Sequence, residues 1–192
     1  MTNNKPLVGV SQCLLGDAVR YDGHSKANQI VLEQLSQLFE LIPVCPEVEA
    51  GLSIPRPAVQ LTGSIKKPRL IGRNDPSLDI TDLMQDYCKT RPAELNHLSG
   101  FIFKSRSPSC GLNSTPVYID GHCVTETGRG IFAKNLCMII PLFGWLLDLT
   151  CSDLYVFPGG AARGAALLDT HSLFLSVFGN GPDPLQFRGV PV

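Results

Sequence analysis

Three short apolar runs, separated by segments of helical pattern, constrain the fold of this chain more than any other feature. The runs are PLVGVSQ (6–12), LIPVC (41–45) and SGFIF (99–103). Their length and their β-branched and aromatic residues predict buried strands. Because strands that alternate with helices build a parallel sheet flanked by helices, we expect an α/β fold. The 192 residues suffice for one domain with a full core.

The segments between these runs contain recognisable helix and turn patterns. Apolar residues recur at helical spacing from Ser25 to Phe39, and residues 79–97 predict a second helix with Asp79 or Thr81 as its cap. Pro46 should stop regular structure, so residues 46–66 are expected to form a long irregular excursion. The remaining predicted elements are hairpins through VQLTG and PRLIG (59–72) and through PVYIDGHCV (116–124), and a helix beginning in GRGIFAKNL (128–136).

A cysteine stands at or just beyond the end of each predicted strand. Cys13 follows the first run, Cys45 ends the second, and Cys110 lies in the loop SRSPSCG after the third. The carboxyl ends of parallel strands line the ligand crevice of such sheets, so three thiols are expected at one rim. Thiolates hold iron–sulfur clusters, usually four to a cluster, and three protein ligands would leave one iron open to a substrate. Lys104 and Arg106 should favour the thiolate form.

Two other interpretations of these cysteines remain open from pattern alone. The three positions match no CxxC spacing, and free cysteine is often a small buried hydrophobic residue. They are therefore either unrelated buried thiols, or one nucleophilic cysteine with two bystanders. The odd total of seven argues against a full disulfide framework. The other four are interpreted as filler: Cys88, Cys123, Cys137 and Cys151.

Composition and charge exclude several classes of function. The net charge of −1 provides no basic field for nucleic acid. No secretory signal is visible, and the longest apolar run, from Met138, has about a dozen residues where a membrane span needs roughly 20. No GxGxxG or Walker pattern indicates a nucleotide phosphate site. We therefore expect a cytoplasmic protein with no nucleic-acid or membrane partner.

Three motifs in the same order resemble the thiouracil desulfidase family. They are VGVSQCLLGDAVRYDG (8–23), PVCPEVEAGLSIPRP (43–57) and SGFIFKSRSPSCG (99–111), and with the later GRGIFAKNL the resemblance runs from about Leu7 through Leu136. It implies a small Rossmann-like three-layer α/β domain with a mainly parallel sheet and a [4Fe-4S] cluster held by three cysteines. It also implies removal of sulfur from 2-thiouracil, or from a related small thio-compound, to give the oxo product and sulfide.

The resemblance also implies roles for five residues. Cys13, Cys45 and Cys110 match the cluster ligands, Glu47 in the CPE motif matches the catalytic glutamate, and Ser107 in SPSC matches the active-site serine. In such a reaction Glu47 would be the general acid–base. Ser107 would hydrogen-bond the pyrimidine ring or relay a proton. Without the motif, Glu47 fits a solvated loop carboxylate equally well, and Ser107 fits a turn residue.

Three further polar residues lie in the motif loops. Arg20 in VRYDG and Arg56 in IPRP are expected near the same rim, where they support the charge of the cluster or the loops themselves. An ordinary surface position is an equal alternative for both arginines. His24 follows the Asp22-Gly23 turn and is interpreted as a surface histidine.

The C-terminal segment departs from the family. Residues 138–192 contain no Lys or Glu, whereas the family closes with a charged helical segment. We divide the chain into a desulfidase-like domain, 1–137, and an atypical tail, 138–192, that is either poorly ordered or the product of a reading-frame change, which resequencing the gene tests. A milder departure is Ala50, which stands where the family has a glycine pair.

Three functions compete at this point. The first is an enzyme, a cluster-dependent desulfidase for a thiolated pyrimidine. The second is a non-catalytic iron–sulfur or sulfide-carrier protein with the same cysteines. The third is an α/β domain that binds a small molecule without metal. The sequence leaves the oligomeric state open.

Overall fold

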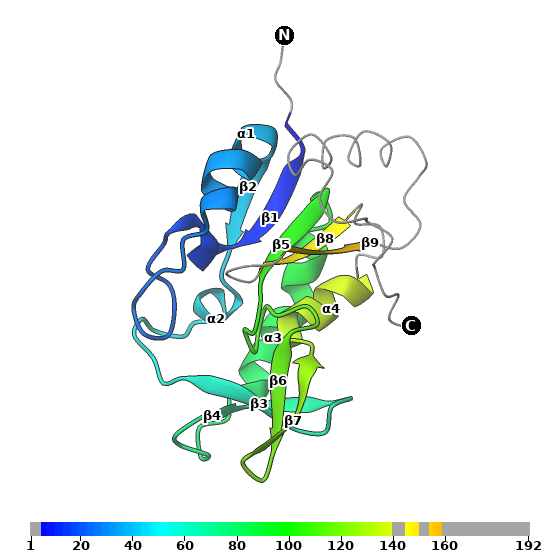
Figure 1. Cartoon of the computed structure of the whole chain (residues 1–192). Helices are drawn as coiled ribbons and strands as arrows, with labels where there is room; N and C mark the ends of the chain where they lie inside the picture. Colours follow the sequence, from blue (N-terminus) through cyan, green and yellow to red (C-terminus); the bar gives the residue numbers. More distant parts are fainter. Residues whose placement is uncertain (1–4, 140–144, 150–153, 159–192) are drawn as a thin grey trace.

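The computed structural model describes residues 5–139, 145–149 and 154–158, and its first sheet, sheet A, is mainly parallel (Figure 1). The strand order is β2-β1-β5-β8-β9, in which β2, β1, β5 and β8 run parallel and β9 is antiparallel. The strands are β1 (Leu7–Ser11), β2 (Glu40–Val44), β5 (Gly100–Lys104), β8 (Trp145–Leu149) and β9 (Leu154–Pro158). The three strands expected from the apolar runs are confirmed as β1, β2 and β5.

A second sheet, sheet B, was not predicted as a unit. It has the order β4-β3-β6-β7, with β3 (Val59–Gly63), β4 (Pro68–Gly72), β6 (Thr115–Ile119) and β7 (His122–Gly128). The pairs β3–β4 and β6–β7 are the two predicted hairpins. The parallel pairing of β3 with β6 joins them into one sheet. Local turn patterns reveal each hairpin, but this long-range pairing leaves no local pattern in the sequence.

The helices differ from expectation at their beginnings. The helical stretch expected from Ser25 begins as η2 (Ile30–Leu35) and continues as α1 (Ser36–Leu38). The long helices α3 (Thr81–Glu94) and α4 (Ile131–Ile139) are close to the predicted ones. The prediction that Asp79 or Thr81 caps α3 was wrong, because the N-cap is Ile80, which lies between them and makes no side-chain cap hydrogen bond. Two short helices, η1 (Gln12–Leu15) and α2 (Pro46–Glu49), follow β1 and β2 directly.

The strand ends before Pro46, as predicted, but the expectation that an irregular segment begins there was wrong. Pro46 occupies the first position of α2, immediately after Cys45. A proline is favoured there because its missing N–H would have no partner within the helix and its fixed φ already suits helical geometry. The next residue, Glu47, is consequently held in the first turn of a helix.

Side chains of β5 alternate between the two faces of sheet A and define three layers. Phe101 and Phe103 belong to a buried cluster with residues of α3 and α4, whereas Ile102 packs in a second cluster with residues of β1 and η2. Gly9 on β1 allows close packing, since a Cβ atom there would lie 2.3 Å from the ring of Phe101. The sheet with helices on both faces confirms the predicted Rossmann-like three-layer α/β fold.

The strand register brings the carboxyl ends of β1, β2 and β5 to one edge of sheet A. Ser11 at the end of β1 lies beside Val44 at the end of β2, and Val10 lies beside Ile102 of β5. Because these strands are neighbours and parallel, the residues that follow them emerge together. We call this edge the cysteine rim.

The atypical tail contributes to the same sheet. Strands β8 and β9 lie within residues 138–192, and β8 pairs with β5 in register from Gly100 to Lys104. Residues 159–192 of the tail lie outside the described residues. The prediction that the tail is poorly ordered or the product of a reading-frame change falls largely on these residues. Within the described part, no helix is long and apolar enough to cross a membrane.

Candidate active site

The structure gathers the three rim cysteines around one cavity. Cys13 lies in η1 after β1, Cys45 precedes α2, and Cys110 lies in the loop that follows β5. All three line a cavity of about 400 Å³. Cys13 and Cys45 are half-buried, and Cys110 is buried. The three cysteines that the sequence places at strand ends therefore line one and the same cavity.

Burial raises the pKa of all three thiols, and Cys13 and Cys110 are also shifted upward by the neighbouring cysteines. Desolvation raises the pKa of Cys13 to about 11, against the opposing effect of Lys104, and the neighbouring Cys45 raises it further. Desolvation likewise raises the pKa of Cys45, opposed by the backbone N–H of Val48. The pKa of Cys110 is raised well above its usual value by desolvation, with contributions from Cys45 and Cys13. A bound metal would replace these protons.

Residues of both sheets form the wall of the cavity. Besides the cysteines, Glu47 and Ser107 line it from the side of sheet A, and Gln60 on β3 and Tyr118 on β6 line it from sheet B. Glu47 is the only acidic side chain among the described lining residues. The basic lining residues are Arg20, Lys26, Arg56, Arg73, Lys104 and Arg106. The cavity therefore has a positive lining, which suits anionic ligands and thiolates.

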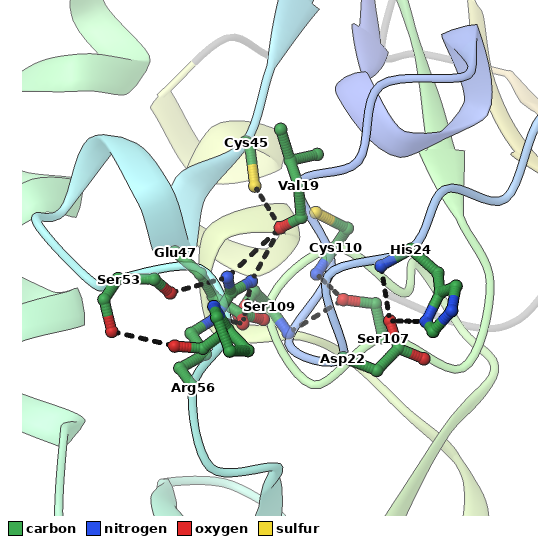
Figure 2. Close-up of polar contacts among 11 residues, drawn as sticks. Val19, Asp22, His24, Cys45, Glu47, Ser53, Arg56, Ser107, Ser109 and Cys110 are labelled. Atoms are coloured by element: carbon green, nitrogen blue, oxygen red, sulfur yellow. Dashed lines mark hydrogen bonds and ion pairs between the residues drawn. The ribbon is translucent and has the colours of Figure 1, made fainter.

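Glu47 is buried and ion-paired rather than solvated. Its side chain is 13% exposed, and that of Arg56, 2.8 Å away, is 6% exposed. Arg56 Nε donates to Glu47 Oε2 at 2.8 Å, and the hydroxyl of Ser109 donates to Glu47 Oε1 at 2.8 Å (Figure 2). Each carboxylate oxygen thus has its own fixed donor. We call Arg56 and Ser109 the carboxylate clamp.

Arg56 is not a surface arginine. Its two terminal nitrogens each donate to the carbonyl of Val19 at 3.1 Å, and one also donates to the carbonyl of Ser53. The same Val19 carbonyl lies 3.9 Å from the Cys45 sulfur (Figure 2). Arg56 therefore connects the loop after η1 to Glu47, and of the two interpretations of this arginine the supporting role holds.

Ser107 holds the cysteine loop in shape. Its Oγ accepts hydrogen bonds from the backbone N–H groups of Ser109 at 3.3 Å and Cys110 at 3.1 Å. Neither bond uses the hydroxyl hydrogen. Ser107 thus has the turn role and, as a lining residue of the cavity, keeps a donor for a ligand.

The other polar residues of the motif loops lie as follows. Arg20 pairs with Asp22 at 3.0 Å and lines the cavity, and His24 beside them is largely exposed, as expected. Lys104 lowers the pKa of Cys13, in the direction predicted, although burial outweighs it. Arg106 is exposed and lies 3.8 Å from Glu126 on β7.

Among the four cysteines interpreted as filler, the described ones lie away from the rim. Cys88 lies on the buried face of α3, where desolvation raises its pKa to about 12. Cys137 is half-buried on α4, and Cys123 is exposed on β7. Cys151 lies outside the described residues.

Sequence patterns missed two parts of this site. The role of Ser109 was not predicted, because Ser107 in the same SPSC motif was the serine assigned to the site. The fold shows that the hydroxyl of Ser109 contacts Glu47. Glu49 accepts a hydrogen bond from the backbone N–H of Cys45 at 3.0 Å and contacts Tyr87 and Arg91 of α3, each at 2.9 Å. In the sequence, only the spacing of four residues between Cys45 and Glu49, one helical turn, could have indicated this contact.

The donor set of the rim fits an iron–sulfur cluster. Within the part of the chain that the structure describes, no group of three or more His, Cys, Asp or Glu side chains is arranged to hold a metal ion. A cubane cluster differs because each thiolate binds a different iron atom, so its ligands are further apart than those of a single ion. Three thiols around one cavity with a positive lining meet that requirement.

Comparisons with known proteins agree with these features. The family model described as 2-thiouracil desulfurase matches residues 8–143. No curated protein matches the chain. Among solved structures, a [4Fe-4S]-dependent thiouracil desulfidase, TudS, is 28% identical with a TM-score of 0.55, and the match covers 71% of this chain and 87% of that one. The chain therefore belongs to the 2-thiouracil desulfurase family.

Proposed function

We propose that this chain is an iron–sulfur-dependent desulfidase. It would remove the sulfur of 2-thiouracil, or of a related small thiolated pyrimidine, and release the oxo product and sulfide. Membership of the family and the likeness to TudS support this proposal. The observation that carries it is the placement of three thiols and one clamped carboxylate around a single cavity.

Cys13, Cys45 and Cys110 are the proposed ligands of a [4Fe-4S] cluster. When bound, the cluster would supply a Lewis-acidic iron without a protein ligand, which suits the soft sulfur of a thiocarbonyl group. The surrounding arginine and lysine side chains would offset the negative charge of the three thiolates. The basic side chains that line the cavity would therefore help to hold the cofactor by electrostatic attraction.

The proposed reaction is a hydrolysis with no net oxidation or reduction. Water adds to C2 of the ring, the carbon–oxygen bond forms, and the carbon–sulfur bond breaks as sulfide leaves. Glu47 accepts a proton from the attacking water and returns one to the departing sulfide. Arg56 holds Oε2 of Glu47 through the 2.8 Å ion pair, so the carboxylate keeps its position while it exchanges protons.

Ser107 and two residues of sheet B are the proposed contacts to the ring. The hydroxyl hydrogen of Ser107 is directed by neither of its backbone bonds and is available to a ring acceptor. The amide of Gln60 offers one donor and one acceptor, which matches the adjacent C=O and N–H groups of a pyrimidine edge. Tyr118 lines the same wall and offers an aromatic surface.

Anaerobic reconstitution followed by assay tests the proposal. We expect a brown protein that contains iron and inorganic sulfide, and that converts 2-thiouracil to equal amounts of uracil and sulfide. Glu47→Gln should retain iron and lose turnover, whereas Glu94→Gln, at an exposed carboxylate of α3, should behave as wild type. Wild-type turnover by Glu47→Gln would refute the role of Glu47. Iron without sulfide release would favour the non-catalytic carrier, and a colourless protein without iron would reject both.

A further inference from the structure

Two serines of the SPSC motif perform different tasks. The hydroxyl of Ser107 accepts backbone N–H groups and lines the cavity. The hydroxyl of Ser109 is buried and donates to Oε1 of Glu47 at 2.8 Å. The motif therefore carries one serine that faces the ligand space and one that faces the carboxylate.

The backbone of Ser109 is fixed from two sides. Its N–H donates to Ser107 Oγ, and its carbonyl accepts the N–H of Ala133 in the first turn of α4 at 3.2 Å. Gly130 lies against it so closely that a Cβ atom there would be 2.5 Å from the carbonyl carbon and oxygen of Ser109. These contacts restrain the backbone of Ser109 and so favour one direction of approach of its hydroxyl to Glu47.

The opposite half of the clamp is equally fixed. Arg56 binds Oε2 of Glu47 while its other nitrogens are held by the carbonyls of Val19 and Ser53 (Figure 2). A glutamate side chain has three rotatable bonds, and free rotation would spread its lone pairs over many directions. Two donors from separate loops, one on each oxygen, restrict the carboxylate to one plane.

We propose that Ser109 is a positioning residue which, together with Arg56, orients the carboxylate of Glu47 toward the cavity. The inference rests on the proposed function, in which Glu47 is the general base. Each carboxylate oxygen can accept more than one hydrogen bond, so the clamp leaves acceptor capacity for a water molecule. Ser109 itself contacts neither substrate nor cofactor in this assignment. Its effect on the reaction passes entirely through Glu47.

The first test compares Ser109→Ala with Ser114→Ala in the reconstituted holoenzyme. Ser114 is the matched control because its hydroxyl lies in the same loop and accepts the N–H of Arg106, away from Glu47. For Ser109→Ala we expect the iron content to stay at the wild-type level, KM to stay within about twofold and kcat to fall by roughly 10- to 100-fold, as for a misplaced catalytic group. Ser109→Thr, which keeps the hydroxyl, should recover most of the loss.

A second comparison places Ser109→Ala in the Glu47→Gln background. If Ser109 acts through Glu47, the second substitution should lower the residual kcat no further. In the iron-free protein, Ser109→Ala should lower Tm by several degrees in the wild-type background and by clearly less in the Glu47→Gln background, because a bond to a charged acceptor is stronger than one to a neutral acceptor.

The outcomes separate the two proposals. Unchanged kcat in Ser109→Ala, or an equal loss in both backgrounds, would overturn the positioning role. A fall in iron content together with kcat would indicate a structural role and would overturn it as well. If the wild-type protein releases no sulfide, the proposed function fails, and the Tm comparison of the iron-free proteins decides the clamp alone. Equal Tm shifts in the two backgrounds would then reject it.

Discussion

Glu49 and Cys45 are joined by a hydrogen bond from the backbone N–H of Cys45 to Glu49 Oε1 at 3.0 Å. The other carboxylate oxygen of Glu49 binds Tyr87 and Arg91, so one side chain attaches the Cys45 backbone to α3. Residues that hold a metal ligand in place commonly affect retention of the metal. This contact therefore leads to the first prediction.

Glu49→Ala should weaken iron retention without removing a ligand. The loss of such a support typically lowers metal affinity about 10- to 100-fold. The decay of cluster absorbance during a challenge with an iron chelator measures the effect. Glu94→Ala is the control, because Glu94 also pairs with Arg91, at 3.0 Å, but makes no contact with Cys45. Equal decay rates in the two variants would contradict the prediction.

Breaking the buried ion pair should destabilise the protein strongly. Arg56→Met leaves the carboxylate of Glu47 buried without its cation, which should lower the free energy of unfolding by about 3–5 kcal/mol. Urea denaturation of the iron-free protein gives this value. Arg69→Met, at the largely exposed pair with Asp79, should lower it by less than about 1 kcal/mol.

The double variant Glu47→Gln/Arg56→Met sharpens this comparison. Since the two groups neutralise each other, the double change should lower the free energy of unfolding by less than the sum of the single changes. Strict additivity would mean that the pair does not act as a unit.

Gln60→Leu should impair substrate binding more than turnover. If the amide meets the pyrimidine edge, its loss leaves ring groups without partners in the cavity, and KM for 2-thiouracil should rise roughly 10-fold. Steady-state kinetics of the reconstituted protein provide the measurement. Gln37→Leu makes the same chemical change on the exposed side of α1 and should leave KM unchanged. An unaltered KM in Gln60→Leu would remove Gln60 from the proposed ring contacts.

Asp79 should make the stability of the region around α3 depend on pH. The hydroxyl of Thr81 holds the pKa of Asp79 below its usual value, with a smaller effect from Arg69, and Asp79 Oδ1 accepts the N–H of Thr81 at 2.9 Å. Because the folded-state pKa is lowered, this stability is present above the unfolded pKa of about 3.9 and is lost as the pH falls through the folded value.

Asp79→Asn tests this dependence. It should lower the free energy of unfolding by about 1 kcal/mol at pH 7, because the hydrogen bonds from Thr81 lose their charged acceptor. In urea titrations at pH 7 and near pH 2, the difference from wild type should shrink at the lower pH. A difference that stays constant would show that the charge of Asp79 is not its source.

Local patterns predicted the parts of the fold that depend on neighbouring residues. The apolar runs indicated β1, β2 and β5, and the turn at Asp120-Gly121 indicated the β6–β7 hairpin. The pairing of β3 with β6 escaped prediction because it joins distant segments. The helix α2 also escaped it, because Pro46 was interpreted as the end of regular structure after a strand and not as the first residue of a helix.

The candidate site likewise has features that local sequence patterns predict and features that only the folded chain reveals. Strand ends brought Cys13, Cys45 and Cys110 to one rim, since topology follows from the order of the elements. The sequence could not show which serine contacts Glu47, because Ser107 and Ser109 are the same residue type in one short motif. Only the folded loop shows that the hydroxyl of Ser109 contacts Glu47, whereas that of Ser107 accepts backbone N–H groups. The assignments of ligands and catalytic residues remain predictions for the experiments above.

The pairing of β8 with β5 places part of the tail on the side of β5 away from β1. With Trp145–Leu149 alongside, β5 is an interior strand held by neighbours on both sides, and the loop with Cys110 follows its end. A chain cut after residue 143, where the family match stops, would leave β5 as an open border with unpaired amides. A strand from beyond the family match thus supports the strand whose end leads to one of the three thiols.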